Sequence, residues 1–204
     1  MPTTSELRNW LAHSLTYEAY LEIMREEADQ PTDGLAEEDA QHVAFTQLNL
    51  HRTERIGRTY RIAAELADLL ARLPGPETWL AITEPWCGDS AQCLPHIAVM
   101  AATRPALDLR ILLRDDNPDV MDRYLTDGKR SIPRLVVLAA DGRELMTWGP
   151  RPAAAQAVFD AARDEGLEKP QILERLHLFY GRDRGRALER EFIALLGARL
   201  GGDG

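Results

Sequence analysis

The sequence predicts an α/β protein with a central mixed β-sheet flanked by helices, and with extra helices at both ends. Three observations favour this fold class. An apolar run of strand formers at 78–83 is followed by helical spacing up to about residue 101 and by a second apolar run at 107–113, the order of a βαβ unit with parallel strands. Two more strand-like runs flank Asp141-Gly142, a strong hairpin signal. Helical periodicity fills both flanks of this region.

Composition and charge limit the classes of partner. With 204 residues, 45% of them hydrophobic and 28% charged, the chain is long enough for one globular domain with extensions. Its formal net charge of −9 argues against nucleic acid or an anionic membrane as the main partner, because clustered Lys and Arg bind both. No secretory signal and no membrane-spanning run is visible. Two cysteines are too few for a disulfide framework, so the sequence predicts a cytoplasmic protein.

Residues 1–74 are expected to form an N-terminal helical extension. Residues 16–29 place their apolar side chains on one face of an amphipathic helix, and turn residues end it. From Leu35 to about Leu73 the apolar residues keep a roughly helical period, which predicts one long helix with Gly57 as the place where it would break. We expect the arginines interleaved along it to form a solvated face rather than a patch for an acidic partner.

Residues 86–95, with the sequence Trp-Cys-Gly-Asp-Ser-Ala-Gln-Cys-Leu-Pro, hold both cysteines. They follow the first predicted strand and lead into the helix after it, so the stretch is a strand-to-helix turn. Cys87 falls at the start of that helix, where unpaired N–H groups and the positive end of the helix dipole favour thiolate over thiol. We therefore interpret Cys87 as the candidate nucleophile rather than as a small buried hydrophobe.

The remaining elements follow in order. After the strand at 107–113, a short helix beginning near Pro118 leads to the hairpin. A helix at 153–165 is expected to pack back on the sheet, so a central domain spans residues 77–165. Residues 168–204 contain two more helical runs and are expected to form a C-terminal extension that packs on the same domain.

In this order the features resemble the thioredoxin superfamily, whose active-site loop reads Trp-Cys-x-x-Cys and runs into a helix with a proline further on. The superfamily also carries an Ile-Pro or Val-Pro pair with a cis peptide bond that faces the active cysteine. The helical flanks resemble a bacterial branch of thioredoxin-like proteins more than ordinary thioredoxin. The residues that carry the resemblance are Trp86, Cys87, Gly88, Pro95, Ile132-Pro133, Asp141-Gly142 and Gly149.

Three positions depart from the superfamily pattern. Ser90 occupies the place of the second cysteine, which implies a mechanism with a single thiol in the loop. Arg134 stands where ordinary thioredoxins carry a smaller residue, so substrate selectivity is expected to differ. Ala81 occupies the place of the buried acid that thioredoxins keep six residues before the first cysteine. This sequence therefore lacks, at that position, a group that would transfer a proton while the mixed disulfide is resolved.

The neighbours of Cys87 predict its reactivity. Ser90 lies three residues later on the same helix face, where its hydroxyl could donate a hydrogen bond to a thiolate. Asp89 opposes a thiolate, so we expect the pKa of Cys87 to be lowered, but less than in a strongly activated site. Cys93 lies about 9 Å further along the helix, beyond the roughly 7 Å between Cα atoms that a disulfide spans. Cys93 is therefore expected to be a core residue, and Cys87 alone to react promptly with alkylating reagents.

The resemblance implies a thiol-disulfide oxidoreductase in cell redox homeostasis, of single-thiol type. Cys87 would be the nucleophile and Ser90 its hydrogen-bond partner, while Cys93 would be a resolving thiol only if the first helical turn unwound. The expected partners are protein disulfides or a low-molecular-weight thiol, and no cofactor is expected. The expected substrate-binding residues are Trp86, Gly88, Asp89, Ile132, Pro133 and Arg134.

Two alternatives stay open. The first is a non-catalytic thioredoxin-like module in which the groove beside Trp86 and Pro133 grips a partner protein. The second is the carriage of an iron–sulfur cluster between two protomers, which single-thiol glutaredoxins perform with an added small thiol. A metal site made of Cys87, Cys93 and His96 is disfavoured because only three ligands are in view. The sequence does not determine the oligomeric state.

Overall fold

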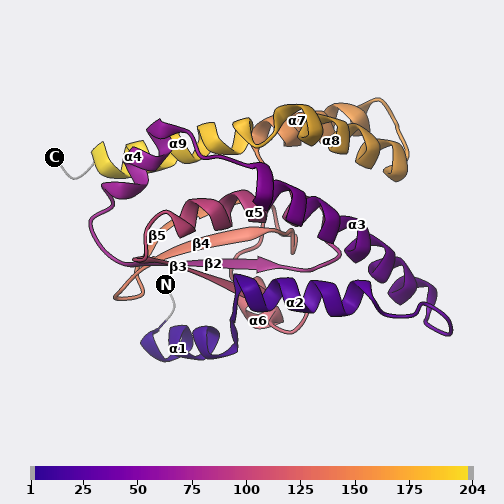
Figure 1. Cartoon of the computed structure of the whole chain (residues 1–204), viewed down its shortest axis with the longest axis horizontal. Helices are drawn as coiled ribbons and strands as arrows, with labels where there is room; N and C mark the ends of the chain where they lie inside the picture. Colours follow the sequence, from indigo (N-terminus) through magenta and orange to yellow (C-terminus); the bar gives the residue numbers. More distant parts are fainter. Residues whose placement is uncertain (1–2, 202–204) are drawn as a thin grey trace.

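A five-stranded mixed sheet forms the centre of the protein in a computed structural model that describes residues 3–201 (Figure 1). The strand order is β1-β3-β2-β4-β5, with β2 and β3 parallel and the other neighbouring pairs antiparallel. The predicted βαβ unit, hairpin and α/β fold class are confirmed. The strands are β1 (Leu15–Thr16), β2 (Glu77–Thr83), β3 (Leu107–Leu113), β4 (Arg134–Ala139) and β5 (Glu144–Trp148).

Helices cover both faces of this sheet, as Figure 1 shows, with α7, α8 and α9 along one side and α1 and α6 on the other. In the described part of the chain they are α1 (Thr4–His13), α2 (Tyr17–Ala28), α3 (Glu37–Thr59), α4 (Ala64–Ala71), α5 (Gly88–Ala102), α6 (Pro118–Met121), α7 (Ala153–Asp164), α8 (Lys169–Asp183) and α9 (Arg186–Gly201). No helix among the described residues is both long enough and apolar enough to cross a membrane.

Strand β2 lies at the centre of the sheet because its middle residues, Trp79 to Ile82, are all apolar, and both its faces are buried. Trp79 and Ala81 point into a core shared with α2, α4, α5, α8 and α9. Leu80 and Ile82 point to the opposite face, into a smaller core with side chains from α1 and α6. The C-terminal end of β2 carries the chain directly into the loop that holds Cys87.

The prediction of one long helix from Leu35 to about Leu73 is wrong. The helix breaks after Thr59, where Tyr60 adopts an extended backbone, and α4 begins four residues later. A carboxylate from α9 holds the break, because Glu189 accepts hydrogen bonds from the Tyr60 hydroxyl at 2.8 Å and from the Ala63 amide at 2.7 Å. Gly57, the expected weak point, stays inside α3. A tertiary contact thus decides where the helix ends.

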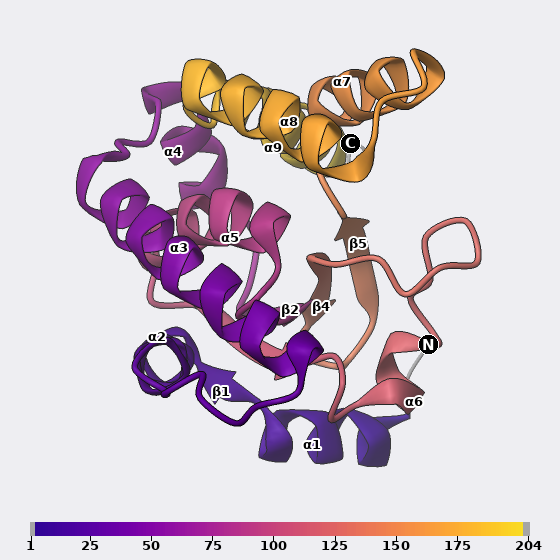
Figure 2. The same ribbon diagram turned by 90° about the vertical axis from the view of Figure 1, so that its right-hand side faces the viewer.

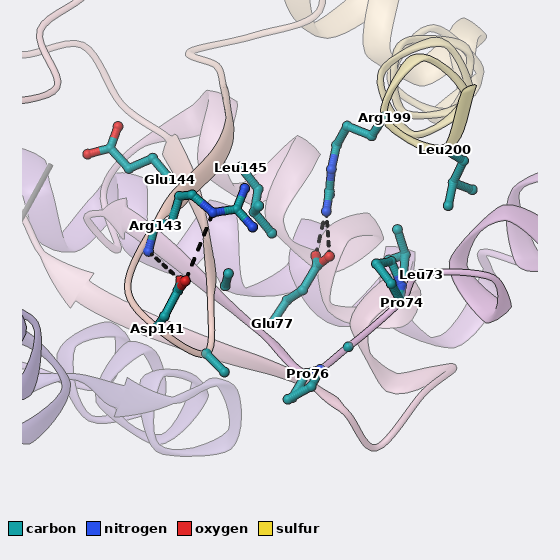
Figure 3. A pocket seen from close by; sticks show the side chains of 13 residues that line it. Leu73, Pro74, Pro76, Glu77, Asp141, Arg143, Glu144, Leu145, Arg199 and Leu200 are labelled. Carbon is teal, nitrogen blue, oxygen red and sulfur yellow. Dashed lines mark hydrogen bonds and ion pairs between the residues drawn. The ribbon is translucent and has the colours of Figure 1, made fainter. Parts of the chain in front are cut away.

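A buried ion pair fixes the last helix to the start of the sheet (Figure 3). The Arg199 guanidinium donates to Glu77 at 2.5 Å, and the Trp79 indole donates to the same carboxylate at 3.0 Å. A cavity of about 510 Å³ lies around this pair and the Asp141 turn. Because Glu77 begins β2, this cavity lies at the opposite end of the strand from Cys87 and does not adjoin it.

Candidate active site

Cys87 is the N-cap residue of α5, and its loop is held from both sides. Its amide donates to the Glu84 carbonyl at 3.1 Å, and its carbonyl accepts from the Ala91 amide at 3.1 Å. The side-chain amide of Asn49, on α3, donates to the Pro85 carbonyl at 3.0 Å. A helix of the N-terminal extension therefore helps to position the nucleophile loop.

The Cys87 thiol faces the segment that precedes β4. Its Sγ donates to the Ile132 carbonyl at 3.4 Å, and the Ile132-Pro133 peptide bond is cis. The sequence separates these residues widely, but the fold brings them into contact. Cys87 is only 8% exposed.

The expectation of an accessible Cys87 with a lowered pKa is wrong. Burial and, next in size, the negative charge of Asp89 raise the pKa of Cys87 to about 11. Hydrogen bonds from the Ser90 hydroxyl and from the amides of Ser90 and Asp89 act in the opposite direction but are outweighed. The helix N-terminus is present as predicted, yet desolvation of the thiolate exceeds what it contributes. At pH 7 a pKa of about 11 leaves roughly one thiolate in ten thousand molecules.

Ser90 is almost fully buried between the Thr83 hydroxyl and the Cys87 thiol. The Thr83 hydroxyl, at the end of β2, donates to Ser90 Oγ at 2.6 Å. Thr83 in turn is a hydrogen-bond partner of the buried Tyr20 from α2. The serine that replaces the second cysteine is thus tied into a polar chain that ends at Cys87.

The Asp89 carboxylate has two hydrogen-bond donors inside the protein. It accepts from the Arg151 guanidinium at 2.6 Å and from the Tyr180 hydroxyl at 2.5 Å. Burial raises the pKa of Asp89, and the Arg151 charge opposes that rise. The Tyr180 hydroxyl also accepts a hydrogen bond from the Cys93 thiol, with 3.9 Å between sulfur and oxygen.

Cys93 lies in the larger core, whereas Cys87 belongs to the smaller one on the other face of the sheet. It is 1% exposed, and burial raises its pKa. Both cysteines are free thiols.

The flanking helices cover two of the expected substrate-binding positions. His42, on α3, stacks on the Trp86 ring with the ring centroids 4.8 Å apart, and the Arg114 guanidinium lies over that ring at 4.8 Å. Gly88 lies beneath α8, since a methyl group added to it would meet His177 Cε1 at 3.3 Å. The loop is therefore shielded from the α3 and α8 sides.

The segment around Pro133 is packed closely against the end of β5. Gly149 has φ of +114°, and a methyl group added to it would lie 2.2 Å from the Pro133 carbonyl oxygen. Arg134 donates to the Gly149 carbonyl at 3.0 Å and to the Thr147 hydroxyl at 3.1 Å. Only glycine accommodates both this backbone conformation and this approach.

Comparison with known proteins establishes the family. A thioredoxin family model matches residues 36–163, which is more than half of the chain. The chain belongs to this thioredoxin family. The matched segment takes in α3 of the N-terminal extension, the Cys87 loop, the Ile132-Pro133 pair and most of α7.

Solved structures share the fold. A protein of unknown function from Pseudomonas aeruginosa aligns over 100% of both chains with a TM-score of 0.59 and 21% identity. An HIV epitope-scaffold aligns over 97% of this chain and 99% of its own, with a TM-score of 0.58 and 20% identity. A comparison with curated proteins found no significant match.

Several residues around this thioredoxin-family loop were not recognisable from the sequence. Arg151, Tyr180 and His177 lie far along the chain from Cys87, and no local pattern marks them.

Glu84 gave a weak signal as a carboxylate at the end of a buried strand. Burial raises the pKa of Glu84 to about 7, although its carboxylate accepts the Asp115 amide at 2.7 Å.

Within residues 3–201 no three His, Cys, Asp or Glu side chains lie close enough together to hold a metal ion. His96 hydrogen-bonds the Gln92 carbonyl through Nδ1 at 2.9 Å, and Tyr60 packs on its ring. These contacts place His96 in the packing between α5 and the α3–α4 break.

Proposed function

We propose that this thioredoxin-family protein exchanges thiols and disulfides at Cys87 in a single-thiol cycle. The contact of Cys87 Sγ with the Ile132 carbonyl, 3.4 Å away and next to a cis proline, carries the proposal. It puts the thiol beside a stretch of backbone on which an extended substrate chain can pair. The position of Cys93 in a separate core supports a cycle that does not use it.

The cycle balances with one external thiol. The Cys87 thiolate attacks one sulfur of a disulfide R–S–S–R′, which gives Cys87–S–S–R and R′–S⁻, and R′–S⁻ takes up the proton that Cys87 lost. A low-molecular-weight thiol R″–SH then attacks the R sulfur as its thiolate. This step gives R–S–S–R″ and returns Cys87, which regains a proton. The net reaction is R–S–S–R′ plus R″–SH giving R–S–S–R″ plus R′–SH.

Substrate docking accounts for how a thiol with a raised pKa becomes reactive. In the free protein the Cys87 thiol donates a hydrogen bond to the Ile132 carbonyl. A substrate N–H that pairs with that carbonyl competes for the same acceptor and releases the thiol. The three donors from Ser90 and Asp89 then remain to stabilise the thiolate.

Trapping with a small neutral disulfide tests this cycle. Incubation with 2,2′-dithiodiethanol should add one mercaptoethanol group to the wild type, and the rate should rise about tenfold per pH unit between pH 7 and 10 because thiolate is the attacking species. Cys87→Ser should form no adduct, while the matched variant Cys93→Ser should react like the wild type. An adduct that persists in Cys87→Ser, or a wild type that forms none at pH 10, contradicts the proposal.

A specific observation favours a second candidate, a non-catalytic binding module. Cys87 is buried, and its pKa of about 11 makes it a poor nucleophile at pH 7. Such a module would bind a partner through the Pro133 side and keep its affinity in Cys87→Ala. Lack of turnover with added thiol, together with that retained affinity, would favour this candidate. The iron–sulfur alternative requires an outward-facing thiolate, and the absorbance spectrum of purified protein tests it.

A further inference from the structure

A large cavity lies beside the Ile132-Pro133 bond. It measures about 920 Å³, within the size range of small-molecule sites. Its walls come from the loop that joins α6 to β4, from β5 and from α7, which Figure 2 shows on one side of the molecule. Ser131 and Arg134 both line it, so it adjoins the Ile132-Pro133 pair directly.

Two arginines in this cavity have hydrogen-bonding capacity to spare. A guanidinium carries five N–H donors, and Arg134 uses two of them, on the neutral acceptors Gly149 and Thr147. Arg151 donates to Asp89 and stacks on Phe159. The Nε atoms of both arginines are buried and have no partner among the described residues. Unpaired buried donors of this kind cost stability.

The charge of Arg134 is not neutralised by a neighbour. Among the described residues no carboxylate lies within ion-pair distance of it, and burial lowers its pKa from the ordinary value. Two of the acids lining the cavity have hydrogen-bond or ion-pair partners in the cavity wall. Asp160 pairs with Arg163 at 3.2 Å, and Glu191 accepts from the Trp148 indole at 2.7 Å. The third, Asp127, is exposed to solvent.

We propose that this cavity binds a carboxylate of the small disulfide that Cys87 exchanges, through the guanidinium of Arg134. A guanidinium fork matches a carboxylate in geometry and charge, and it forms the stronger, charge-assisted kind of hydrogen bond. The Cα atoms of Ile132 and Arg134 are at most about 7 Å apart. A disulfide whose sulfur lies at Cys87, beside Ile132, therefore brings a carboxylate a few bonds away to the Arg134 guanidinium. This inference rests on the proposed function for the exchange step but not for the binding step.

Two disulfides of matched length test the preference. The probes are 3,3′-dithiodipropionate, which carries a carboxylate at each end, and the neutral 2,2′-dithiodiethanol. The wild type should exchange the carboxylate probe with a kcat/KM ten- to a hundredfold higher, the range that a charge-assisted hydrogen bond provides. Arg134→Gln should lose that preference through KM. The matched control Arg143→Gln, on the distant hairpin, should keep it.

Further variants separate binding from folding. Arg134→Gln also removes bonds to the β5 end, so Thr147→Val, which removes one of those acceptors but keeps the charge, should retain the preference. Arg134→Lys keeps the charge without the fork and should show an intermediate value. If Arg134→Gln does not melt like a folded protein, a reduced preference in Arg134→Lys and an unchanged preference in Thr147→Val decide the question.

Calorimetry on Cys87→Ser distinguishes the two proposals. This variant should bind 3,3′-dithiodipropionate without exchange, and Arg134→Gln on the same background should bind about ten- to a hundredfold more weakly. Equal exchange of both probes by the wild type, or binding that ignores Arg134, would overturn the carboxylate site and leave the exchange function standing. Arg134-dependent binding with no exchange of either probe would overturn the exchange function and leave the carboxylate site.

Discussion

Replacing Asp89 by Asn should make Cys87 more acidic and more reactive. Asp89 is the second largest cause, after burial, of the raised pKa of Cys87. Asp89→Asn removes the charge but keeps a side chain of the same shape, whose single amide oxygen replaces one of the two carboxylate oxygens that accept from Arg151 and Tyr180.

The expected size follows from the charges. A nearby unit charge shifts a pKa by about 1 to 3 units. Because burial is a larger cause than Asp89 of the rise from 9.0 to about 11, we expect the lower end, about one unit or 1.4 kcal/mol. One unit gives about ten times more thiolate at pH 7. Each thiolate is intrinsically weaker by about a factor of three, so the net rate should rise about threefold.

The assay is the pH dependence of iodoacetamide alkylation, followed by intact mass on Cys93→Ser backgrounds. The wild-type midpoint should lie near 11, and that of Asp89→Asn about one unit lower. Asp164→Asn, at an exposed position with a side chain 76% accessible, is the matched control and should not move the midpoint. Thermal melting checks that each variant is folded. An unchanged or higher midpoint in Asp89→Asn would refute the electrostatic explanation.

Three further predictions concern stability. Glu84 has a pKa raised to about 7, so the folded state favours its neutral form and loses stability as pH rises from 4.5 through 7. Glu84→Gln should therefore raise the free energy of unfolding by roughly 3 kcal/mol at pH 8 and by almost nothing at pH 4. Urea titrations at both pH values measure this difference, and equal effects would exclude the raised pKa of Glu84 as its cause. Gly149→Ala forces a methyl group to 2.2 Å from a backbone oxygen at positive φ and should cost about 3 kcal/mol or prevent folding, while Gly75→Ala, which meets nothing within 4 Å, should change melting little. Arg199→Ala leaves the buried Glu77 carboxylate without its ion-pair partner and should cost about 3 kcal/mol by urea unfolding, and a loss below 1 kcal/mol would mean that water replaces the pair.

Much of the fold was predictable because its signals are local. The apolar run at 78–83 and the Asp141-Gly142 turn each encode an element within a few residues, and the structure has both. The break between α3 and α4 was not predictable, because Glu189 determines it from more than a hundred residues away. Strand β1 was also missed, since two residues carry too little pattern to be seen.

The site shows the same division between local and distant causes. The loop, the helix start and the Ile132-Pro133 pair follow from short motifs, so Cys87 could be selected from the sequence. Its pKa could not be predicted, because burial by the flanking helices outweighs the helix N-terminus. Asp89 was recognised as unfavourable for a thiolate, but its partner Arg151 is 62 residues away in the chain.

The flanking helices shape the direction from which a substrate can approach. His42 on α3 stacks on Trp86, and His177 on α8 lies over Gly88, so two sides of the loop are occupied by side chains of the extensions. The large cavity adjoins the Ile132-Pro133 pair, and Arg134 gives it a positive charge. If Cys87 exchanges disulfides as proposed, the burial that raises its pKa keeps the thiol protonated at pH 7 and so limits reaction with unselected oxidants. In the proposed cycle a substrate that pairs with the Ile132 carbonyl releases the thiol, and substrate recognition is then a condition for reaction.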